Sequence, residues 1–258
     1  MKNILQKVIN FLGYEIKKIQ KNLDFDDIYK KLFKNKKNII IFDVGANKGQ
    51  SIERFLKIFG NNCTIHAFEP VEDEYSNLKK KYLNQDNIIL NNFALGSANE
   101  NKDLHIAVKT GASSFNKLQN TTWLKQRSEE YKVDTENFIN KIDSVTIKKI
   151  DLYCLEKSIQ NIDILKIDTQ GYEDEVLKGA QEMLNRNIIN AIECEIVLDD
   201  VYDKRFSFSD LEKYLIPSFR ICGIKTYNEN LFQDISFFAD ILYIKQKIIS
   251  KDLYNEKF

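Results

Sequence analysis

The stretch FDVGANKGQS, residues 42–51, follows three isoleucines and holds two of the nine glycines in this 258-residue chain. The apolar run indicates a buried strand with Asp43 at its end. Gly45 and Gly49 flank the turn that follows, because glycine permits backbone conformations and close approaches that a side chain blocks. In an open parallel sheet, ligands bind beyond the carboxyl ends of the strands, near such a turn. The stretch therefore predicts a strand, a ligand-binding turn and a helix.

Two kinds of nucleotide-like ligand fit a turn of this type. Dinucleotide sites use the spacing G-x-G-x-x-G and place a pyrophosphate on the helix N-terminus. Here the spacing is G-x-x-x-G, and the preceding Asp43 would repel a pyrophosphate. A carboxylate is better placed beside a cationic amine, such as the methionine part of S-adenosylmethionine. Ala46 and Asn47 form the middle of the turn, and Gln50 or Ser51 opens the helix. The alternative is a tight turn with a purely structural role.

Glu69 ends a second apolar strand in HAFEP, 26 residues after Asp43, and Pro70 follows it. A carboxylate at this place can accept two hydrogen bonds from the ribose hydroxyls of an adenosine. The third strand ends in residues 92–96, where Asn92 and Ala94 would face the adenine. Taken singly, Glu69 could also be a solvated acid at a strand end.

Apolar runs and amphipathic stretches alternate along most of the chain, which predicts an α/β fold with a doubly wound, mostly parallel sheet. Strands are predicted at 37–44, 63–70, 87–96, 163–168 and 190–197. Helices are predicted at 51–60, 71–83, 171–186 and 208–216. Two closing strands, 221–228 and 239–245, are predicted to form an antiparallel C-terminal edge. The alternation breaks at about 100–150, where strand-like pieces at 103–108 and 144–153 surround a polar segment. We interpret that region as an insertion beside the ligand site.

Composition and charge exclude several classes of protein. The chain is 43% hydrophobic and carries 38 basic and 38 acidic residues, so its net charge is zero. A general nucleic-acid binder usually has a basic excess, and no nucleic-acid partner is predicted. The four cysteines stand singly, and we find neither an apolar run of 18 residues nor a signal-peptide pattern. A cytoplasmic location is therefore expected.

Residues 1–37 differ from the predicted domain at 38–258. They hold ten lysines and four acidic residues, a net charge of +6, with apolar residues at helical spacing between positions 4 and 16. A basic amphipathic helix can lie on an anionic membrane surface, so residues 1–20 predict peripheral contact with the inner face of the membrane. The alternative is a leading helix packed on the domain or on a partner subunit. The oligomeric state is not predicted.

Six stretches of the sequence resemble FkbM-type methyltransferases and occur in the order of that family: DVGANKGQS, AFEP, NNFALGS, GASSF, IDILKIDTQGYEDEVLKGA and AIECEIV. The match covers roughly residues 38–245. The resemblance implies the class I methyltransferase (Rossmann-like) fold, S-adenosyl-L-methionine as cofactor, and O-methylation, commonly of a sugar or polyketide hydroxyl. It also implies that Ser113 and Ser114 in GASSF lie near the cofactor or substrate. One departure is Thr169-Gln170, where the family usually has Val-Glu.

Lys166 lies within an apolar strand and therefore requires a partner. Asp168 at the strand's end is the first candidate, and Glu195 of the neighbouring strand is the second. One carboxylate would act as general base for the acceptor hydroxyl, with Asp168 also close to the cofactor, while Lys166 would stabilise a developing alkoxide. The alternatives are a structural ion pair or a Mg²⁺ site. The spacing matches no dedicated metal motif, and no metal ligand is predicted.

The sequence predicts an S-adenosylmethionine-dependent O-methyltransferase acting on a hydroxyl of a small molecule or glycan, namely a sugar in a cell-surface glycan or its precursor. Two alternatives stay open at this point. A nicotinamide-dependent oxidoreductase would share the fold, and a non-catalytic S-adenosylmethionine-binding protein would share the binding residues. A nucleic-acid methyltransferase is expected to show an Asn/Asp-Pro-Pro-Tyr-type block, which the sequence lacks.

Overall fold

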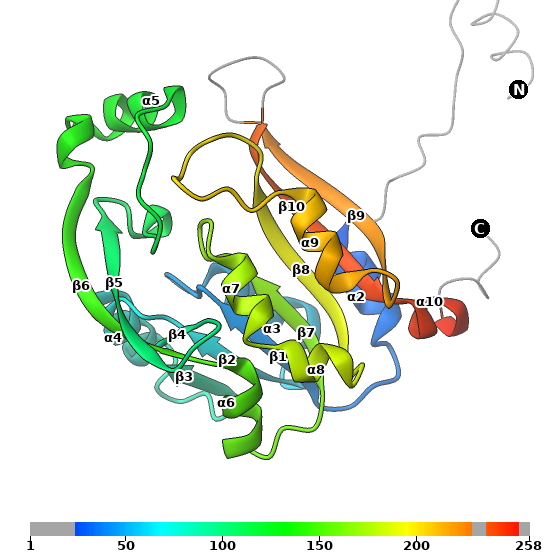
Figure 1. The fold of residues 1–258 in the computed structure, drawn as a ribbon. Coiled ribbons are helices and arrows are strands. Elements are labelled where there is room, and N and C mark those ends of the chain that lie inside the picture. The colour runs from blue at the N-terminus through cyan, green and yellow to red at the C-terminus, as the bar shows by residue number, and fades with distance from the viewer. Residues whose placement is uncertain (1–23, 229–235, 253–258) are drawn as a thin grey trace, which may run out of the picture.

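The computed structural model describes residues 24–228 and 236–252, which fold around a seven-stranded sheet of order β3-β2-β1-β7-β8-β10-β9 (Figure 1). The strands are β1 (Ile39–Val44), β2 (Cys63–Phe68), β3 (Ile88–Asn91), β7 (Ile162–Ile167), β8 (Ile189–Val197), β9 (Phe219–Asn228) and β10 (Ser236–Lys245). The first five are parallel, and β10 runs antiparallel to β8 and β9. This is the predicted α/β sheet with its antiparallel C-terminal edge, and the last strand lies between β8 and β9.

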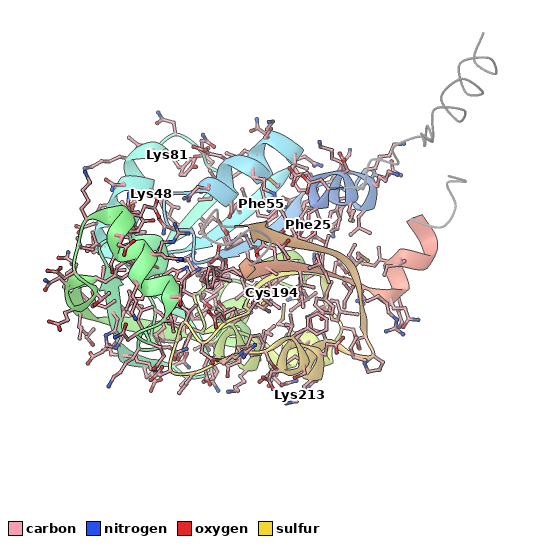
Figure 2. All side chains as sticks on the ribbon, turned by 90° about the horizontal axis from the view of Figure 1, so that it is seen from above. Phe25, Lys48, Phe55, Lys81, Cys194 and Lys213 are labelled. Atoms are coloured by element: carbon pink, nitrogen blue, oxygen red, sulfur yellow. The ribbon has the colours of Figure 1, made fainter. Side chains whose placement is uncertain are left out.

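Helices cover both faces of this sheet. One face carries α2 (Phe25–Leu32), α3 (Gln50–Phe59), α4 (Glu72–Lys81) and α10 (Gln246–Asp252). The other face carries α6 (Ile150–Glu156), α7 (Glu173–Lys178), α8 (Gln181–Asn185) and α9 (Phe208–Leu215). Figure 2 shows Phe25 and Phe55 on one side of Cys194 in the sheet, and Lys213 of α9 on the opposite side. Two separate apolar cores result, because alternate residues of each strand point to opposite faces.

Helix α2 belongs to the predicted basic lead and packs on the domain. Its N-terminus is capped by Asp24, which accepts a hydrogen bond from the Phe25 N–H. Tyr29 is fully buried, and its hydroxyl donates to Glu193 of β8 at 2.7 Å. Arg54 of α3 pairs with the same carboxylate at 2.6 Å. The amphipathic pattern of residues 4–16 and the membrane contact predicted for residues 1–20 lie outside the described residues. Within the described ranges, no helix has the length and apolar character that crossing a membrane requires.

The predicted insertion contains a second sheet of order β4-β6-β5, which stands at the left of the molecule in Figure 1. Its strands are β4 (Ala94–Leu95), β5 (Glu100–Ala107) and β6 (Ile139–Lys148). Between β5 and β6 lie η1 (Thr110–Ala112), α5 (Thr122–Tyr131) and η2 (Thr135–Asn137). Trp123 of α5 packs against Phe138 and Phe238, which ties this segment to the start of β10.

The strand predicted at 87–96 is wrong in extent, because it divides into β3 and β4 of different sheets. The side chain of Asn91 donates to the Ala67 carbonyl at 3.1 Å and fixes the end of β3 on β2. Beyond the break, the Gly96 N–H donates to the Lys148 carbonyl at 2.9 Å, which holds the chain on β6. Two polar anchors therefore direct adjacent segments into separate sheets.

Two further predicted elements are also divided. The strand at 144–153 ends with β6, and Ile150, Tyr153 and Cys154 instead form the buried face of α6 at helical spacing. The helix at 171–186 breaks into α7 and α8 at Gly179. A Cβ atom on Gly179 would lie 2.0 Å from the Gly96 carbonyl oxygen, so the break permits a close backbone approach that only glycine allows.

Candidate active site

A cavity of about 180 Å³ opens at the carboxyl ends of β1, β2 and β7. The sheet and its loops contribute Val44, Gly45, Asn47, Gln50, Phe68, Glu69, Pro70, Val71, Ala94, Leu95, Asp168, Thr169 and Gln170. The inserted segment contributes Leu104, Thr110, Gly111, Ser113 and Phe115. The site thus lies at the edge of the parallel sheet that the opening stretch predicted.

Backbone hydrogen bonds to the end of β2 hold the turn after β1 in place. The N–H groups of Gly45 and Ala46 both donate to the Phe68 carbonyl at 3.1 Å. Gly45 has a φ of +84°, and a Cβ there would lie 1.9 Å from the Asp168 carbonyl oxygen. Gly49, with a φ of +83°, is the N-cap of α3, which begins at Gln50. The first glycine therefore allows the β1 and β7 loops to touch, and the second starts the helix.

We expect Gly45→Ala to destabilise the protein by at least about 3 kcal/mol, because it combines backbone strain with a backbone clash. Gly60→Ala is the matched control: Gly60 also has a positive φ, of +56°, but a Cβ there would meet nothing within 4 Å. Thermal unfolding of the two variants separates clash from strain. A Gly45→Ala protein as stable as the Gly60→Ala protein would contradict the close approach.

Glu69 is 5% exposed and lies in the cavity wall. Its carboxylate accepts hydrogen bonds from the N–H of Asn47 at 2.7 Å and of Val71 at 2.8 Å, one on each oxygen. Burial raises its pKa to about 7 against the effect of these two bonds. A carboxylate has about four acceptor sites, so each oxygen retains capacity for a donor from a ligand.

The inserted segment closes one side of the cavity with η1 and an apolar wall. The Thr110 hydroxyl donates to Glu74 of α4 at 2.7 Å. Leu104 and Phe115 form the apolar wall and pack with Val71. An apolar wall thus stands near Glu69, a combination that suits a nucleoside with a flat base and ribose hydroxyls.

Lys166 pairs with Asp168 at 3.0 Å, as predicted. Lys166 is buried, whereas 34% of the Asp168 side chain is exposed. Burial opposes ionisation of Asp168, but Lys166 and the hydrogen bonds around it hold the pKa of that carboxyl below its usual value. Burial and the neighbouring Asp168 raise the pKa of Glu195 well above its usual value. Asp168 is therefore a carboxylate at neutral pH, and it ionises more readily than Glu195.

The loop after β7 is fixed by hydrogen bonds to its backbone. Glu173, fully buried, accepts from the N–H groups of Thr169 at 2.9 Å and of Gly171 at 3.1 Å. The Ser114 hydroxyl donates to the Gln170 carbonyl at 2.6 Å. Asn116 donates to the Gly171 carbonyl at 2.5 Å. These bonds hold Gln170 in the left-handed region, at a φ of +55°, with its side chain beside Asp168.

Asp43 is fully buried and lies outside the cavity wall. Neither carboxylate oxygen has a hydrogen-bond partner among the residues that the structure describes. Lys166 is its neighbour in the register of β1 and β7. Burial raises the pKa of Asp43 to about 6, although Lys166 favours the charged form. Contact between Asp43 and a cationic amine therefore stays a prediction.

The predicted site residues fall into two groups. Gly45, Asn47, Glu69, Pro70, Ala94 and Asp168 line the cavity. The others do not, and the structure gives them other places: Asp43, Ala46 and Lys166 are buried, Gly49 and Ser51 start α3, and Asn92 bonds to Glu72. Ser114 supports the backbone of Gln170, and Glu195 bonds to the side chain of that residue.

Several cavity residues were missed by the sequence interpretation. Val71 and Thr169 each follow a predicted residue, so extending the strand-end motifs by one position would have included them. Leu104, Thr110 and Phe115 reach the cavity only because the second sheet folds over it. Phe115 belongs to the GASSF stretch, which the family resemblance placed near the site, whereas no local pattern marks Leu104 or Thr110, since their role depends on packing between distant segments.

The strand order, the antiparallel β10 and the cavity beyond β1 and β2 define a class I methyltransferase fold. Enzymes of this class usually take S-adenosylmethionine as cofactor. The chain belongs to the FkbM methyltransferase family: the Methyltransferase FkbM domain matches residues 43–226, which confirms the resemblance found in the sequence.

Two known proteins show the extent of the likeness. The 2-O-methyltransferase NoeI of Sinorhizobium fredii (strain NBRC 101917 / NGR234) is 25% identical over 183 residues, 70% of this chain and 72% of that protein. The crystal structure of the FkbM methyltransferase from Methylobacillus flagellatus KT superposes with a TM-score of 0.52 at 14% identity. That match covers 80% of this chain and 43% of the solved chain, so it concerns the fold alone.

Proposed function

We propose that the protein is an S-adenosylmethionine-dependent O-methyltransferase whose acceptor is a sugar hydroxyl of a cell-surface glycan or its precursor. The observation that carries this proposal is the presence of Glu69 and Asp168 in the walls of one cavity, at the ends of the two strands that flank β1. Glu69 suits the ribose of a nucleoside, and Asp168 suits the hydroxyl of an acceptor. Methyl transfer to an oxygen is also what the name of the 2-O-methyltransferase relative states.

The described residues fit the cofactor in three respects. Glu69 retains acceptor capacity for ribose hydroxyls, and the wall of Leu104 and Phe115 suits the adenine. Asp43 lies before the turn, its carboxylate has no hydrogen-bond partner among the described residues, and Lys166 is its neighbour, so it favours a further positive charge nearby. When bound, S-adenosylmethionine supplies a methyl group on a positively charged sulfur. Binding both reactants in one cavity orients them for transfer.

Asp168 is the residue that would remove the acceptor's proton. Its carboxylate is ionised at neutral pH, reaches the cavity, and is oriented by Lys166 and Gln170. A sugar hydroxyl is a very weak acid, so its O–H bond must break while the new C–O bond forms. The proton then passes to Asp168, and the positive charge of Lys166 stabilises the negative charge that develops near the oxygen.

The test is incubation with methyl-labelled S-adenosylmethionine and a panel of nucleotide sugars and lipid-linked glycans. Label is expected in the sugar of at least one acceptor, as an alkali-stable ether identified by mass spectrometry. Tight binding of S-adenosylhomocysteine without transfer to any sugar would indicate a non-catalytic binding protein or a different acceptor. A thermal shift with NAD and none with S-adenosylhomocysteine would instead favour an oxidoreductase.

We further propose cytoplasmic location and peripheral contact with anionic membranes through residues 1–20, which carry the basic amphipathic pattern. Deleting residues 1–20 is expected to abolish co-sedimentation with vesicles that contain anionic lipid. Neutral vesicles serve as the control, because attraction between lysines and lipid requires negative charge. Unchanged sedimentation of the truncated protein would contradict membrane contact through this segment.

A further inference from the structure

The side chain of Gln170 makes three hydrogen bonds within the candidate active site. Its Nε2 donates to Asp168 Oδ1 at 3.0 Å and to Glu195 Oε2 at 2.6 Å. Its Oε1 accepts from the Tyr202 hydroxyl at 3.1 Å. An amide nitrogen has two hydrogens, so one goes to each carboxyl group. Every polar atom of this side chain is thereby used.

Two carboxyl groups that share one amide lie close together, and like charges at such separations resist joint ionisation. Titratable groups lie around the pair on several elements: Asp43 of β1, Lys166 of β7, Glu173 of α7, Cys194 of β8, Asp240 of β10, and Tyr202. Glu193 of β8 is ion-paired with Arg54 of α3. Most of these are acids, and Lys166 is bonded to Asp168. The surroundings therefore favour one proton shared by Asp168 and Glu195 over two negative charges.

The position of the amide is set by the backbone beneath it. Ser114 bonds the Gln170 carbonyl, and Glu173 bonds the N–H groups on both sides of that residue. Gly171 follows with a φ of +91° and packs against Tyr202. Since the loop is fixed, the amide stays between the two carboxyl groups, in the place that a bridging cation would occupy.

We propose that Gln170 is a positioning residue that joins Asp168 and Glu195 into a carboxyl pair with a single proton, and thereby holds the Asp168 carboxylate toward the acceptor without a bridging metal ion. This inference rests on the proposed function for the role of Asp168 as base. The pair itself is a property of the protein alone. It can therefore be tested with and without turnover.

The first test is Gln170→Met, which keeps the length of the side chain and removes its donors. Loss of a donor destabilises the charged form of Asp168, so its pKa rises, and the acid limb of the kcat profile is expected to move up by about one pH unit. Asp168 also loses a partner that orients its carboxylate, so turnover at neutral pH should fall at least about tenfold. Gln181→Met on the surface of α8 is the matched control and should change neither quantity.

The second test follows the two acids directly, by NMR of side-chain carboxyl carbons in protein labelled at Asp and Glu. Assignments come from Asp168→Asn and Glu195→Gln. In the wild type, Asp168 and Glu195 are expected to titrate in two well-separated steps, and in Gln170→Met the steps should approach each other. Independent titration of the two acids, identical with and without Gln170, would overturn the inference even if sugars are methylated. A coupled pair in a protein that methylates no sugar would support the pair and overturn the proposed acceptor.

The third test is a gain of function. Gln170→Glu places three carboxyl groups together, the ligand type that hard divalent cations prefer. The variant is expected to bind one Mn²⁺ per chain, seen by electron paramagnetic resonance, and Gln170→Glu with Glu195→Gln should bind it more weakly. Equal Mn²⁺ binding by the wild type would show that the amide does not take the place of a cation.

Discussion

Replacing Asp168 by asparagine is expected to lower kcat by about 10²- to 10⁴-fold, the usual contribution of a general base. Asparagine retains the size of the side chain but cannot accept the hydroxyl proton. The affinity for S-adenosylhomocysteine should change by less than a few fold, because the proposed role of Asp168 concerns the acceptor. Single-turnover transfer to the identified acceptor and calorimetric titration with S-adenosylhomocysteine measure the two quantities.

Asp163→Asn is the matched control, since Asp163 is a fully buried acid at the opposite end of the same strand. Its carboxylate accepts from the Ile40 N–H at 2.9 Å and from Asn190 at 2.7 Å, and it pairs with Lys36. This substitution should lower stability and leave kcat near that of the wild type. A large loss of cofactor affinity in Asp168→Asn, with kcat preserved at saturation, would move Asp168 from the acceptor site to the cofactor site.

Glu69→Gln is expected to weaken the binding of S-adenosylhomocysteine by about 10- to 100-fold, because it exchanges hydrogen bonds to a charged group for weaker neutral ones. The affinity for S-adenosylhomocysteine should also depend on pH. Ribose donors favour the ionised carboxylate, and the pKa of Glu69 in the free protein is about 7. Binding below that pH must release a proton, so the affinity of the wild type should fall by up to about tenfold per pH unit from 7 downward and level off above 8.

The control for this prediction is Glu72→Gln, because Glu72 lies three residues further on and bonds to Asn92 outside the cavity wall. Glu72→Gln should retain the pH dependence of binding, whereas Glu69→Gln should lose most of it. Burial also raises the pKa values of Asp43 to about 6 and of Glu173 to about 7. A pH dependence that survives in Glu69→Gln would therefore assign the proton to one of those two acids.

Much of the central sheet could be predicted because its strands are long, apolar and separated by clear turns. The run before Asp43 and the run before Glu69 each form a buried strand that ends at the cavity. The prediction was wrong where one short stretch of sequence contributes strands to two different sheets. Residues 87–96 look continuous in sequence, yet anchors at Asn91 and Gly96 divide them between two sheets, and those anchors depend on partners far along the chain.

The candidate site was predictable where chemistry and strand ends coincide, as for Glu69 and Asp168. The direction in which a side chain points was harder to predict than its position along a strand. Asp43 lies in β1, one residue before its end, but by strand alternation its side chain faces α2 and α3, with Ile39 and Ile41, and does not line the cavity. Gln170 was noted only as a departure from the family's usual residue, because the bridge it makes requires Glu195 of another strand and Tyr202 beyond it.

The walls of the cavity come from two parts of the chain, the strand ends of the central sheet and the inserted segment. Glu69 and Asp168 lie at strand ends of the central sheet. Residues 104–115 belong to the inserted segment, and side-chain hydrogen bonds such as Thr110 to Glu74 and Ser114 to Gln170 tie that segment to the central domain. Exchanges at Thr110, Gly111 or Ser113 would reshape the cavity, while both carboxylates and the apolar pair Leu104 and Phe115 keep their places. Under the proposed function, such exchanges would change the acceptor without altering the residues proposed for cofactor binding and proton removal.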